Sequence, residues 1–339
     1  MAARISPGYD KCRQKLSDIV PISTPFTLFI TPSQLCNFRC AYCSQSLSGE
    51  RKKEIDFRSQ LLDYGLFLNI AGQASEFPGK FKRVLLTGLG EPLMNPRIPE
   101  MVATLRNLGV ADHYEIFTNA SLLTARLSDE LLHSGLTCLR ISIQGVTKRK
   151  YEEITGRDVD VEGLIENIAY FFHHRKECRV YLKIIDACLE GGDEERFSSL
   201  FGGICDDIFI EHLVKAQPSM GDYDGRADNV RTFYGEPSET REVCPYMFYT
   251  LQTDAVGNVF PCPPLGLPLK FSLGNVLDTP LFDIWRGERL RRLRLAHLTG
   301  RREEIEPCRR CSCYRSFTPQ EDNLDGNPEE IIERMIAEA

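Results

Sequence analysis

The hydrophobic positions of the chain fall into short continuous runs that are separated by longer amphipathic stretches. The runs have the length of strands and lie at 26–31, 83–88, 114–118, 138–143, 179–185 and 207–213. Between them, stretches with helical spacing lie at 55–73, 97–108, 127–134, 161–175 and 193–201. Continuous apolar strands that alternate with helices predict an α/β fold with a parallel sheet covered on its outside.

This pattern alone leaves two architectures open, a barrel and a doubly wound sheet. In either one, functional residues belong at the C-terminal ends of the strands. Before the first strand, residues 1–25 form an extension that we expect to be helical in part.

The pattern changes after residue 213. Residues 214–243 hold several glycines and prolines and show no helical period, so we interpret them as a connector that can carry a substrate-facing loop. Residues 248–253 and 259–260 flank a turn at Asp254–Asn258 and predict a β-hairpin. The tail, 328–339, has the pattern of a short amphipathic helix.

Composition and charge exclude several classes of protein. The 339 residues are 42% hydrophobic and 26% charged, as in an ordinary globular protein. A net charge of −7 argues against a general nucleic-acid binder. The chain has no apolar run of about twenty residues and no hydrophobic signal segment at its N-terminus, so we expect a cytoplasmic protein without membrane contact.

Thirteen cysteines in a large chain without an export signal point to metal ligation rather than to disulfides. Eight of them fall into two groups, at 36–43 and at 244–313. We interpret the other five as small buried apolar residues; they are Cys12, Cys138, Cys178, Cys188 and Cys205.

The first group, Cys36-x3-Cys40-x2-Cys43, follows the first predicted strand. Three thiolates in one loop can face a single point, which suits an iron–sulfur cluster with one iron left open. The alternatives are a zinc knuckle and chance, although structural zinc usually has four protein ligands. The run CNFRCAYC, with Tyr42 before its last cysteine, resembles the signature of the radical S-adenosylmethionine (SAM) enzymes.

The resemblance implies a partial (β/α)6 TIM-like barrel and a [4Fe–4S] cluster whose open iron binds SAM. Further segments resemble SAM-binding positions of that family. The segment Gly88-Leu89-Gly90-Glu91-Pro92 resembles the GGEP motif that holds the amino group of SAM, with Leu89 as a departure.

Other polar residues at strand ends resemble family positions that line the SAM pocket; they are Thr118, Asn119, Ser142 and Gln144. The alternative is that they only form turns. Lys183 and Glu211 are further pocket candidates, because a charged residue in an apolar strand lies at its open end or is paired.

The second group begins with Cys244-x12-Gly257-x4-Cys262 and continues with Cys308, Cys311 and Cys313. The predicted hairpin brings Cys244 and Cys262 side by side, so both can meet the later cysteines. The spacing resembles a small C-terminal SPASM/Twitch-like domain. It implies one auxiliary [4Fe–4S] cluster on Cys244, Cys262, Cys308 and Cys311, with a four-cysteine zinc site as the alternative. Cys313 either replaces Cys311 or is a free thiol that can donate hydrogen.

The family resemblance implies a radical SAM oxidoreductase that cleaves SAM to a 5′-deoxyadenosyl radical and removes hydrogen from a substrate. We expect dehydrogenation of a small sugar or aminocyclitol. The alternatives are epimerisation, with Cys313, Cys188 or Cys205 as hydrogen donor, and peptide modification. The 35 residues before Cys36 leave little room for a leader-binding domain, which favours a small substrate. A zinc-binding interaction module is the non-enzymatic reading.

An arginine-rich stretch at 286–302 has two interpretations. It forms a solvated helix face, or it docks an acidic electron donor of the flavodoxin or ferredoxin type. For the domains we expect a radical SAM core at 26–213, the connector at 214–243, the auxiliary cluster domain at 244–318 and a tail at 319–339.

Overall fold

The computed structural model describes residues 3–9, 12–215, 227–264 and 266–337. Part of the predicted connector, from 216 to 226, lies outside the described residues, whereas 214–215 and 227–243 are described. In the described part of the chain, none of the helices combines the length and the apolar character needed to cross a membrane.

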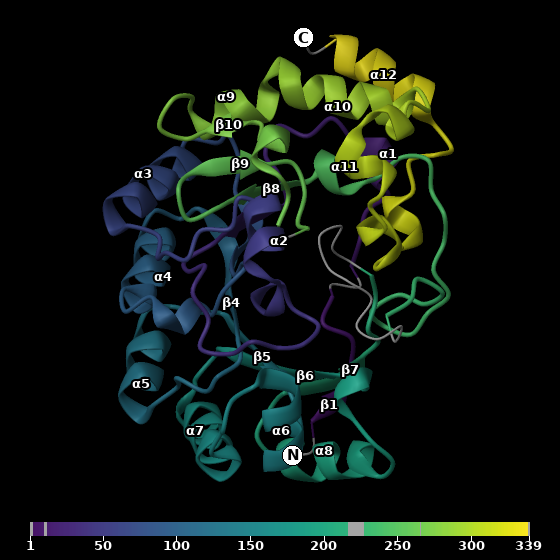
Figure 1. Cartoon of the computed structure of the whole chain (residues 1–339). Helices are drawn as coiled ribbons and strands as arrows, with labels where there is room; N and C mark the ends of the chain where they lie inside the picture. Colours follow the sequence, from purple (N-terminus) through teal and green to yellow (C-terminus); the bar gives the residue numbers. More distant parts are fainter. Residues whose placement is uncertain (1–2, 10–11, 216–226, 265, 338–339) are drawn as a thin grey trace.

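Six parallel strands form the centre of the molecule, as the sequence predicts (Figure 1). They are β2 (Thr27–Ile30), β3 (Phe81–Leu86), β4 (Ala111–Thr118), β5 (Cys138–Ile143), β6 (Arg179–Ile185) and β7 (Asp207–Glu211). Each strand pairs in parallel with the next one along the chain, with Leu28 opposite Val84 and Ile116 opposite Leu139. Every crossover between them contains a helix, which is the pattern of a partial β/α barrel.

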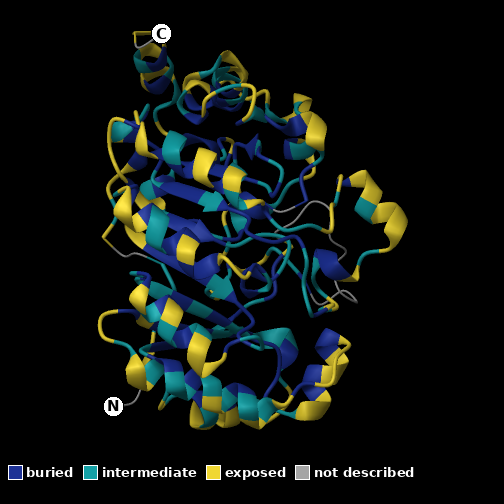
Figure 2. Ribbon diagram, turned by 90° about the vertical axis from the view of Figure 1, so that its left-hand side faces the viewer, coloured by how far each residue is buried: buried dark blue, intermediate teal, exposed yellow. Residues whose placement is uncertain are grey.

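The outer layer consists of α3 (Tyr64–Ser75), α4 (Ile98–Asn107), α5 (Ala125–His133), α7 (Val161–His174) and α8 (Asp193–Phe201). Figure 2 shows that these helices turn exposed residues outward and buried residues toward the sheet. Phe67, Ile70, Val102 and Ile168 are fully buried in this layer. Burying such side chains stabilises the fold by about 1.5–3 kcal/mol each.

One helix prediction is wrong, and one helix was not predicted. The stretch 55–73 is not one helix, because α2 (Gly49–Glu54) ends before it and α3 begins after Asp63. The Asp63 carboxylate accepts hydrogen bonds from the Gly65 and Leu66 amides and so caps the N-terminus of α3. The sequence analysis also missed α6 (Lys148–Thr155), a largely polar helix that is capped by Thr147 and ended by Gly156.

Further strands extend both edges of the barrel sheet. At one edge β1 (Arg4–Ile5) pairs in parallel with β7, so the N-terminal extension contains a strand as well as the short α1 (Leu16–Ile19). At the other edge β8 (Thr250–Thr253) pairs in parallel with β2. The predicted hairpin of β8 and β9 (Asn258–Phe260) is confirmed, and β10 (Gly274–Asn275) completes a sheet of ten strands.

The C-terminal region packs around this second edge (Figure 1). Its helices are α9 (Leu281–Arg286), α10 (Glu288–Leu298), α11 (Glu306–Arg309) and α12 (Pro328–Ala337), the last of which confirms the predicted tail helix. Short 3-10 turns are η1 (Ser44–Ser46), η2 (Pro92–Met94), η3 (Asp186–Cys188), η4 (Tyr246–Phe248), η5 (Leu269–Phe271), η6 (Arg302–Glu304), η7 (Cys313–Arg315) and η8 (Gln320–Asp322).

Candidate active site

The first cysteine group lies in the loop that follows β2, at the C-terminal end of the barrel strands. Cys36, Cys40 and Cys43 are half-buried free thiols. Burial raises the pKa of Cys36 to about 12, and burial together with the charges of Cys43 and Cys36 raises that of Cys40. The three sulfurs are therefore close enough to affect one another's ionisation.

The cysteine loop is held by the C-terminal end of α6. The Arg39 amide donates to the Thr155 carbonyl and the Ala41 amide to the Ile154 carbonyl, each at 2.9 Å. Beneath them the buried Phe38 ring packs edge-on against Tyr151, with the ring centroids 6.4 Å apart. The helix that the sequence analysis missed is thus the support of the cysteine loop.

The loop after β3 packs directly on the cysteine loop. A Cβ atom added to Gly90 would lie 2.3 Å from the Leu35 carbonyl oxygen, so only glycine fits there. The Glu91 amide donates to the same carbonyl at 2.8 Å. From the cysteine loop, Gln45 donates to the carbonyl of Leu89. Leu89, the departure from the family motif, therefore contributes its backbone to this contact.

Glu91 is a buried carboxylate with several donors and no cation beside it. It accepts hydrogen bonds from the Leu93 amide at 3.0 Å, the Thr118 hydroxyl at 2.5 Å and the Asn119 amide at 2.8 Å. Burial raises its pKa to about 7 despite these donors. Within the described residues it has no ion pair with Lys, Arg or His, and such a group fits the ammonium of an amino acid.

The other predicted SAM contacts lie at neighbouring strand ends. Thr118 and Asn119 support Glu91, and the Asn119 side chain also donates to Asn37 of the cysteine loop at 3.0 Å. Ser142 is half-buried at the end of β5, and Gln144 is buried with no hydrogen-bond partner for its Oε1 atom among the described residues.

Two further predicted positions border the same loops. Pro92 begins η2 immediately after Glu91, and an alanine methyl group at Gly88 would collide with the Thr31 side chain. Tyr42 forms a hydrogen bond with the buried Cys188 thiol.

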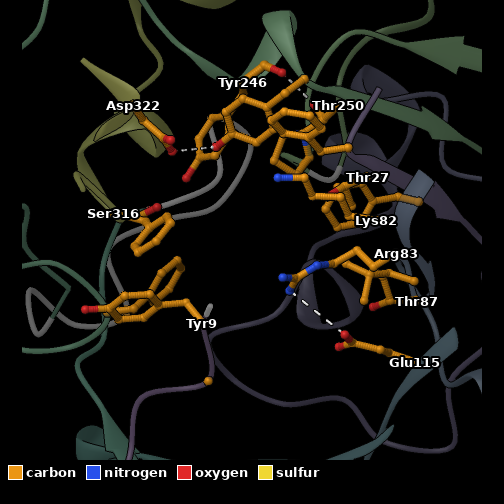
Figure 3. Close-up of a pocket in the computed structure, with 18 of the residues that line it drawn as sticks. Tyr9, Thr27, Lys82, Arg83, Thr87, Glu115, Tyr246, Thr250, Ser316 and Asp322 are labelled. Carbon is orange, nitrogen blue, oxygen red and sulfur yellow. Dashed lines mark hydrogen bonds and ion pairs between the residues drawn. The ribbon is translucent and has the colours of Figure 1, made fainter. Parts of the chain in front are cut away.

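A cavity of about 410 Å³ opens inside the barrel and reaches Thr87, the residue before Gly88. Figure 3 shows polar side chains from the strands on one wall and residues of the C-terminal region on the other. Lys183 and Glu211 form an ion pair that lines it, so these two predicted candidates face the cavity.

Several charged residues that the sequence analysis did not select also line this cavity, among them Arg83, Glu115 and Arg140. The signal for them was a charge at alternate positions inside otherwise apolar strands.

All five cysteines of the second group converge near the hairpin. Burial raises the pKa of Cys262 well above its usual value, and nearby Cys311, Cys244, Cys308 and Cys313 raise it further. Cys313 also lines the 410 Å³ cavity. The second group therefore reaches the cavity from the side opposite the barrel strands.

Arg302 and His297 hold the second group and were not predicted to do so. Arg302 donates to the carbonyls of Cys308 at 3.2 Å and Cys311 at 2.8 Å, and it lies over the Tyr314 ring. The Cys244 amide donates to Nδ1 of His297 at 3.2 Å, and burial lowers the pKa of His297 to about 4.

Among the described residues, no three His, Cys, Asp or Glu side chains converge as they would around a single metal ion. A four-iron cluster keeps its ligating sulfurs farther apart than the ligands of one ion, because each sulfur binds a different iron. Cysteines must lose their protons to bind metal, so binding here would release protons from thiols with raised pKa values. Both groups fit thiolate-bound clusters.

A partial parallel barrel with three cysteines after its first core strand, and a glycine-rich acidic loop after the second, defines a radical SAM protein. Residues 30–185 match the model of the radical SAM superfamily, and residues 244–312 match that of the SPASM iron–sulfur cluster-binding domain. The chain belongs to the radical SAM proteins that carry a C-terminal SPASM domain. These domains bind SAM, the SAM-binding [4Fe–4S] cluster and an auxiliary cluster.

Curated relatives match over part of the chain. A GTP 3′,8-cyclase of Picosynechococcus sp. is 33% identical over 121 residues, which cover 36% of this chain and 35% of that protein. A cofactor-modifying protein of tungsten-containing aldehyde ferredoxin oxidoreductase from Pyrococcus furiosus is 31% identical over 34% of this chain and 30% of its own length. The matched segments span about a third of the length of these relatives.

Solved structures share the fold over most of the chain. BtrN in complex with AdoMet and 2-DOIA has a TM-score of 0.53 and 19% identity, covering 88% of this chain and 97% of BtrN. The enzyme anSMEcpe with bound AdoMet has a TM-score of 0.54 and 15% identity, with 93% of both chains covered. Streptococcus suis SuiB bound to precursor peptide SuiA has a TM-score of 0.56 and 16% identity, covering 89% of this chain and 72% of SuiB.

Proposed function

We propose that this chain is a radical SAM oxidoreductase that dehydrogenates a small hydroxylated molecule such as a sugar or an aminocyclitol. The observation that carries the proposal is the 410 Å³ cavity, which is lined by barrel-strand residues up to Thr87, next to Gly88, and by Cys313 of the second group. Its volume is in the range of about 300–1,000 Å³ that is typical of small-molecule sites.

When bound, SAM and its cluster supply hydrogen-atom abstraction from a substrate carbon, and the auxiliary cluster supplies an acceptor for the next electron. The chain contributes the positions of the reacting groups. Glu91 holds the ammonium of SAM, supported by Gly90, Thr118 and Asn119, while Gln144 offers its free oxygen nearby.

In this proposal a side chain of the cavity wall accepts the proton of the substrate hydroxyl. Glu211 lies at the end of β7 with its side chain 7% exposed and paired with Lys183. We assign Glu211 as the proton acceptor. With a hydrogen atom and one electron taken up by the bound cofactors, the loss of the hydroxyl proton to Glu211 would convert the alcohol to a ketone.

In this proposal the second cysteine group has two roles, cluster binding and candidate hydrogen donation to the substrate. The auxiliary cluster is held by Cys244, Cys262, Cys308 and Cys311. We choose Cys311 over Cys313 because Arg302 donates a hydrogen bond to the Cys311 carbonyl. Cys313 lines the cavity and carries the second candidate function, epimerisation, in which its thiol returns hydrogen to the substrate carbon.

Turnover under nitrogen in deuterated water separates these two functions. The assay contains SAM, a flavodoxin- or ferredoxin-type donor and a panel of sugars and aminocyclitols. Dehydrogenation yields a product that is two hydrogens lighter and has no solvent deuterium on carbon. A product of unchanged hydrogen content with one carbon-bound deuterium would contradict dehydrogenation and support the thiol donor.

Glu211→Gln tests the proton acceptor. We expect it to slow ketone formation by about 10²–10⁴-fold, the usual contribution of a general base, while SAM cleavage continues. Equal ketone formation in the variant and in the unchanged protein would remove Glu211 from the proposal.

A further inference from the structure

The cavity has an excess of positive charge. Five cationic and three anionic side chains line it among the described residues. The cations are Arg13, Lys82, Arg83, Arg140 and Lys183, and the acids are Glu115, Glu211 and Asp322. A neutral sugar would leave two of these positive charges without compensation.

Each acid in the cavity already has its own cation. Asp322 accepts two hydrogen bonds from Arg13, both at 2.5 Å, and Glu211 pairs with Lys183. Glu115 pairs with Arg140, whose guanidinium also donates to the Gly8 carbonyl at 2.7 Å. Burial alone would raise the pKa of Glu115, but Arg140 and Arg83 outweigh it and lower that pKa, so this carboxylate stays ionised.

Among the described residues, Arg83 forms only a long ion pair, with the same Glu115. Its Nη1 atom lies 3.9 Å from the Glu115 carboxylate, which is beyond hydrogen-bond distance, and its guanidinium donates no hydrogen bond to any described residue. Figure 3 shows the Arg83 side chain reaching into the open cavity. The side chain is 24% exposed. Its planar fork of five donors matches the geometry of a carboxylate or a phosphate.

Lys82 adds a further positive charge next to Arg83 on β3. Its ammonium lies 3.9 Å from the centroid of the Phe26 ring and has no carboxylate partner within the described ranges. The far wall of the cavity is aromatic, since the rings of Tyr9, Tyr234 and Phe317 pack at centroid distances of 4.7–5.6 Å. One wall thus suits an anion and the other suits the uncharged face of a ring.

We infer that the substrate is anionic and that Arg83 binds its phosphate or carboxylate group through the guanidinium fork, with Lys82 adding charge. This inference rests on the proposed function in taking the cavity as the substrate site. It narrows the substrate class from neutral sugars and aminocyclitols to those that bear an acidic group.

Three sugars that share one ring test the inference: glucose, glucose 6-phosphate and glucuronate. Their binding is measured by anaerobic calorimetry on the protein reconstituted with both clusters and SAM. We expect saturable binding of an anionic sugar at least tenfold tighter than that of glucose. Arg83→Gln should weaken it at least tenfold, because the variant loses the charge and the paired hydrogen bonds of the guanidinium fork. The anionic sugar that binds more tightly shows whether the site prefers a phosphate or a carboxylate.

Two control variants accompany Arg83→Gln. Arg83→Lys keeps the charge but loses the fork, so binding should fall between the other two proteins. Arg126→Gln on α5 removes an exposed arginine of the same charge outside the cavity and should leave binding unchanged. Thermal unfolding of each variant checks that the barrel is intact.

Three results would overturn the inference: glucose binding as tightly as both anionic sugars, neither anionic sugar binding, or Arg83→Gln binding them as well as the unchanged protein. None of these measurements needs SAM cleavage. A protein that binds anionic sugars but never dehydrogenates a substrate would instead refute the proposed function and leave the anion site standing.

Discussion

At the scale of single residues, the site depends on charged groups whose opposite charge is missing or already shared within the described chain. Glu91 is a buried carboxylate without an ion pair, and Arg83 has only a long ion pair with Glu115, which Arg140 already binds. Leaving a charge without a partner in a folded protein costs free energy. Such groups are therefore the residues at which the chain gives up stability for binding.

The raised pKa of Glu91 predicts how SAM binding depends on pH. Below a pKa of about 7 the carboxyl group is protonated and cannot pair with an ammonium. The amino group of SAM stays protonated up to pH 7, since α-amino groups titrate near 7.7–8.0. Affinity should therefore rise about fivefold from pH 6 to pH 7, as measured by equilibrium dialysis of labelled SAM.

Glu91→Gln is the matched test of this pH dependence. It should weaken SAM binding and leave the remaining affinity the same at pH 6 and pH 7. An unaltered pH dependence in the variant would show that another group is responsible.

At the scale of elements, two loops and one helix end build the SAM-binding end of the barrel. The loop after β3 lies on the loop after β2 so closely that an atom at the Cβ position of Gly90 meets backbone. The end of α6 supports the same loop from another side. The cysteines are thus positioned by packing between elements that are far apart in the sequence.

Gly90→Ala tests the contact between the two loops. Because Leu35 and Ser33 would meet the methyl group with backbone carbonyls, the loops must separate, at a cost of about 1–3 kcal/mol. We expect a lower melting temperature and loss of iron from the first cluster. Gly203→Ala is the control, since its Cβ meets nothing within 4 Å. Equal iron content and melting temperature in the two variants would contradict this account.

Arg302→Gln tests the support of the second cysteine group. Loss of its hydrogen bonds to Cys308 and Cys311 should release the auxiliary cluster and about half of the bound iron, while SAM cleavage persists. The neighbouring variant Arg301→Gln should keep all of the bound iron. The side chain of Arg301 is exposed and forms a hydrogen bond only with Thr299 in the described part. Full iron content in Arg302→Gln would show that the carbonyl clamp is dispensable.

The strands, the hairpin and the cysteine loop could be predicted because each has a local signal in apolar runs and in cysteine spacing. Helix α6 could not, because its sequence, KRKYEEIT, is polar and has no apolar period. The pairing of β8 with β2 joins residues more than two hundred positions apart, and nothing local encodes it. For the same reason, the ion pairs of Glu115 and the clamp by Arg302 became visible only in the folded chain.

At the scale of the whole molecule, one sheet carries both cysteine groups. The register of β2 on β8 places Ile30 opposite Thr253. The first cysteines follow β2 directly, while Cys244 and Cys262 flank the hairpin that begins with β8. Backbone hydrogen bonds between β2 and β8 therefore help to fix the position of the two groups relative to each other, and Cys313 of the second group lines the cavity.

The central proposal is that the first cysteine group holds the cluster that cleaves SAM. The direct measurement is 5′-deoxyadenosine formation under nitrogen with SAM and a strong reductant. Replacing Cys36, Cys40 and Cys43 together by alanine should reduce it to background, whereas replacing Cys244 and Cys262 should leave part of it. Full 5′-deoxyadenosine formation by the triple variant would contradict the account.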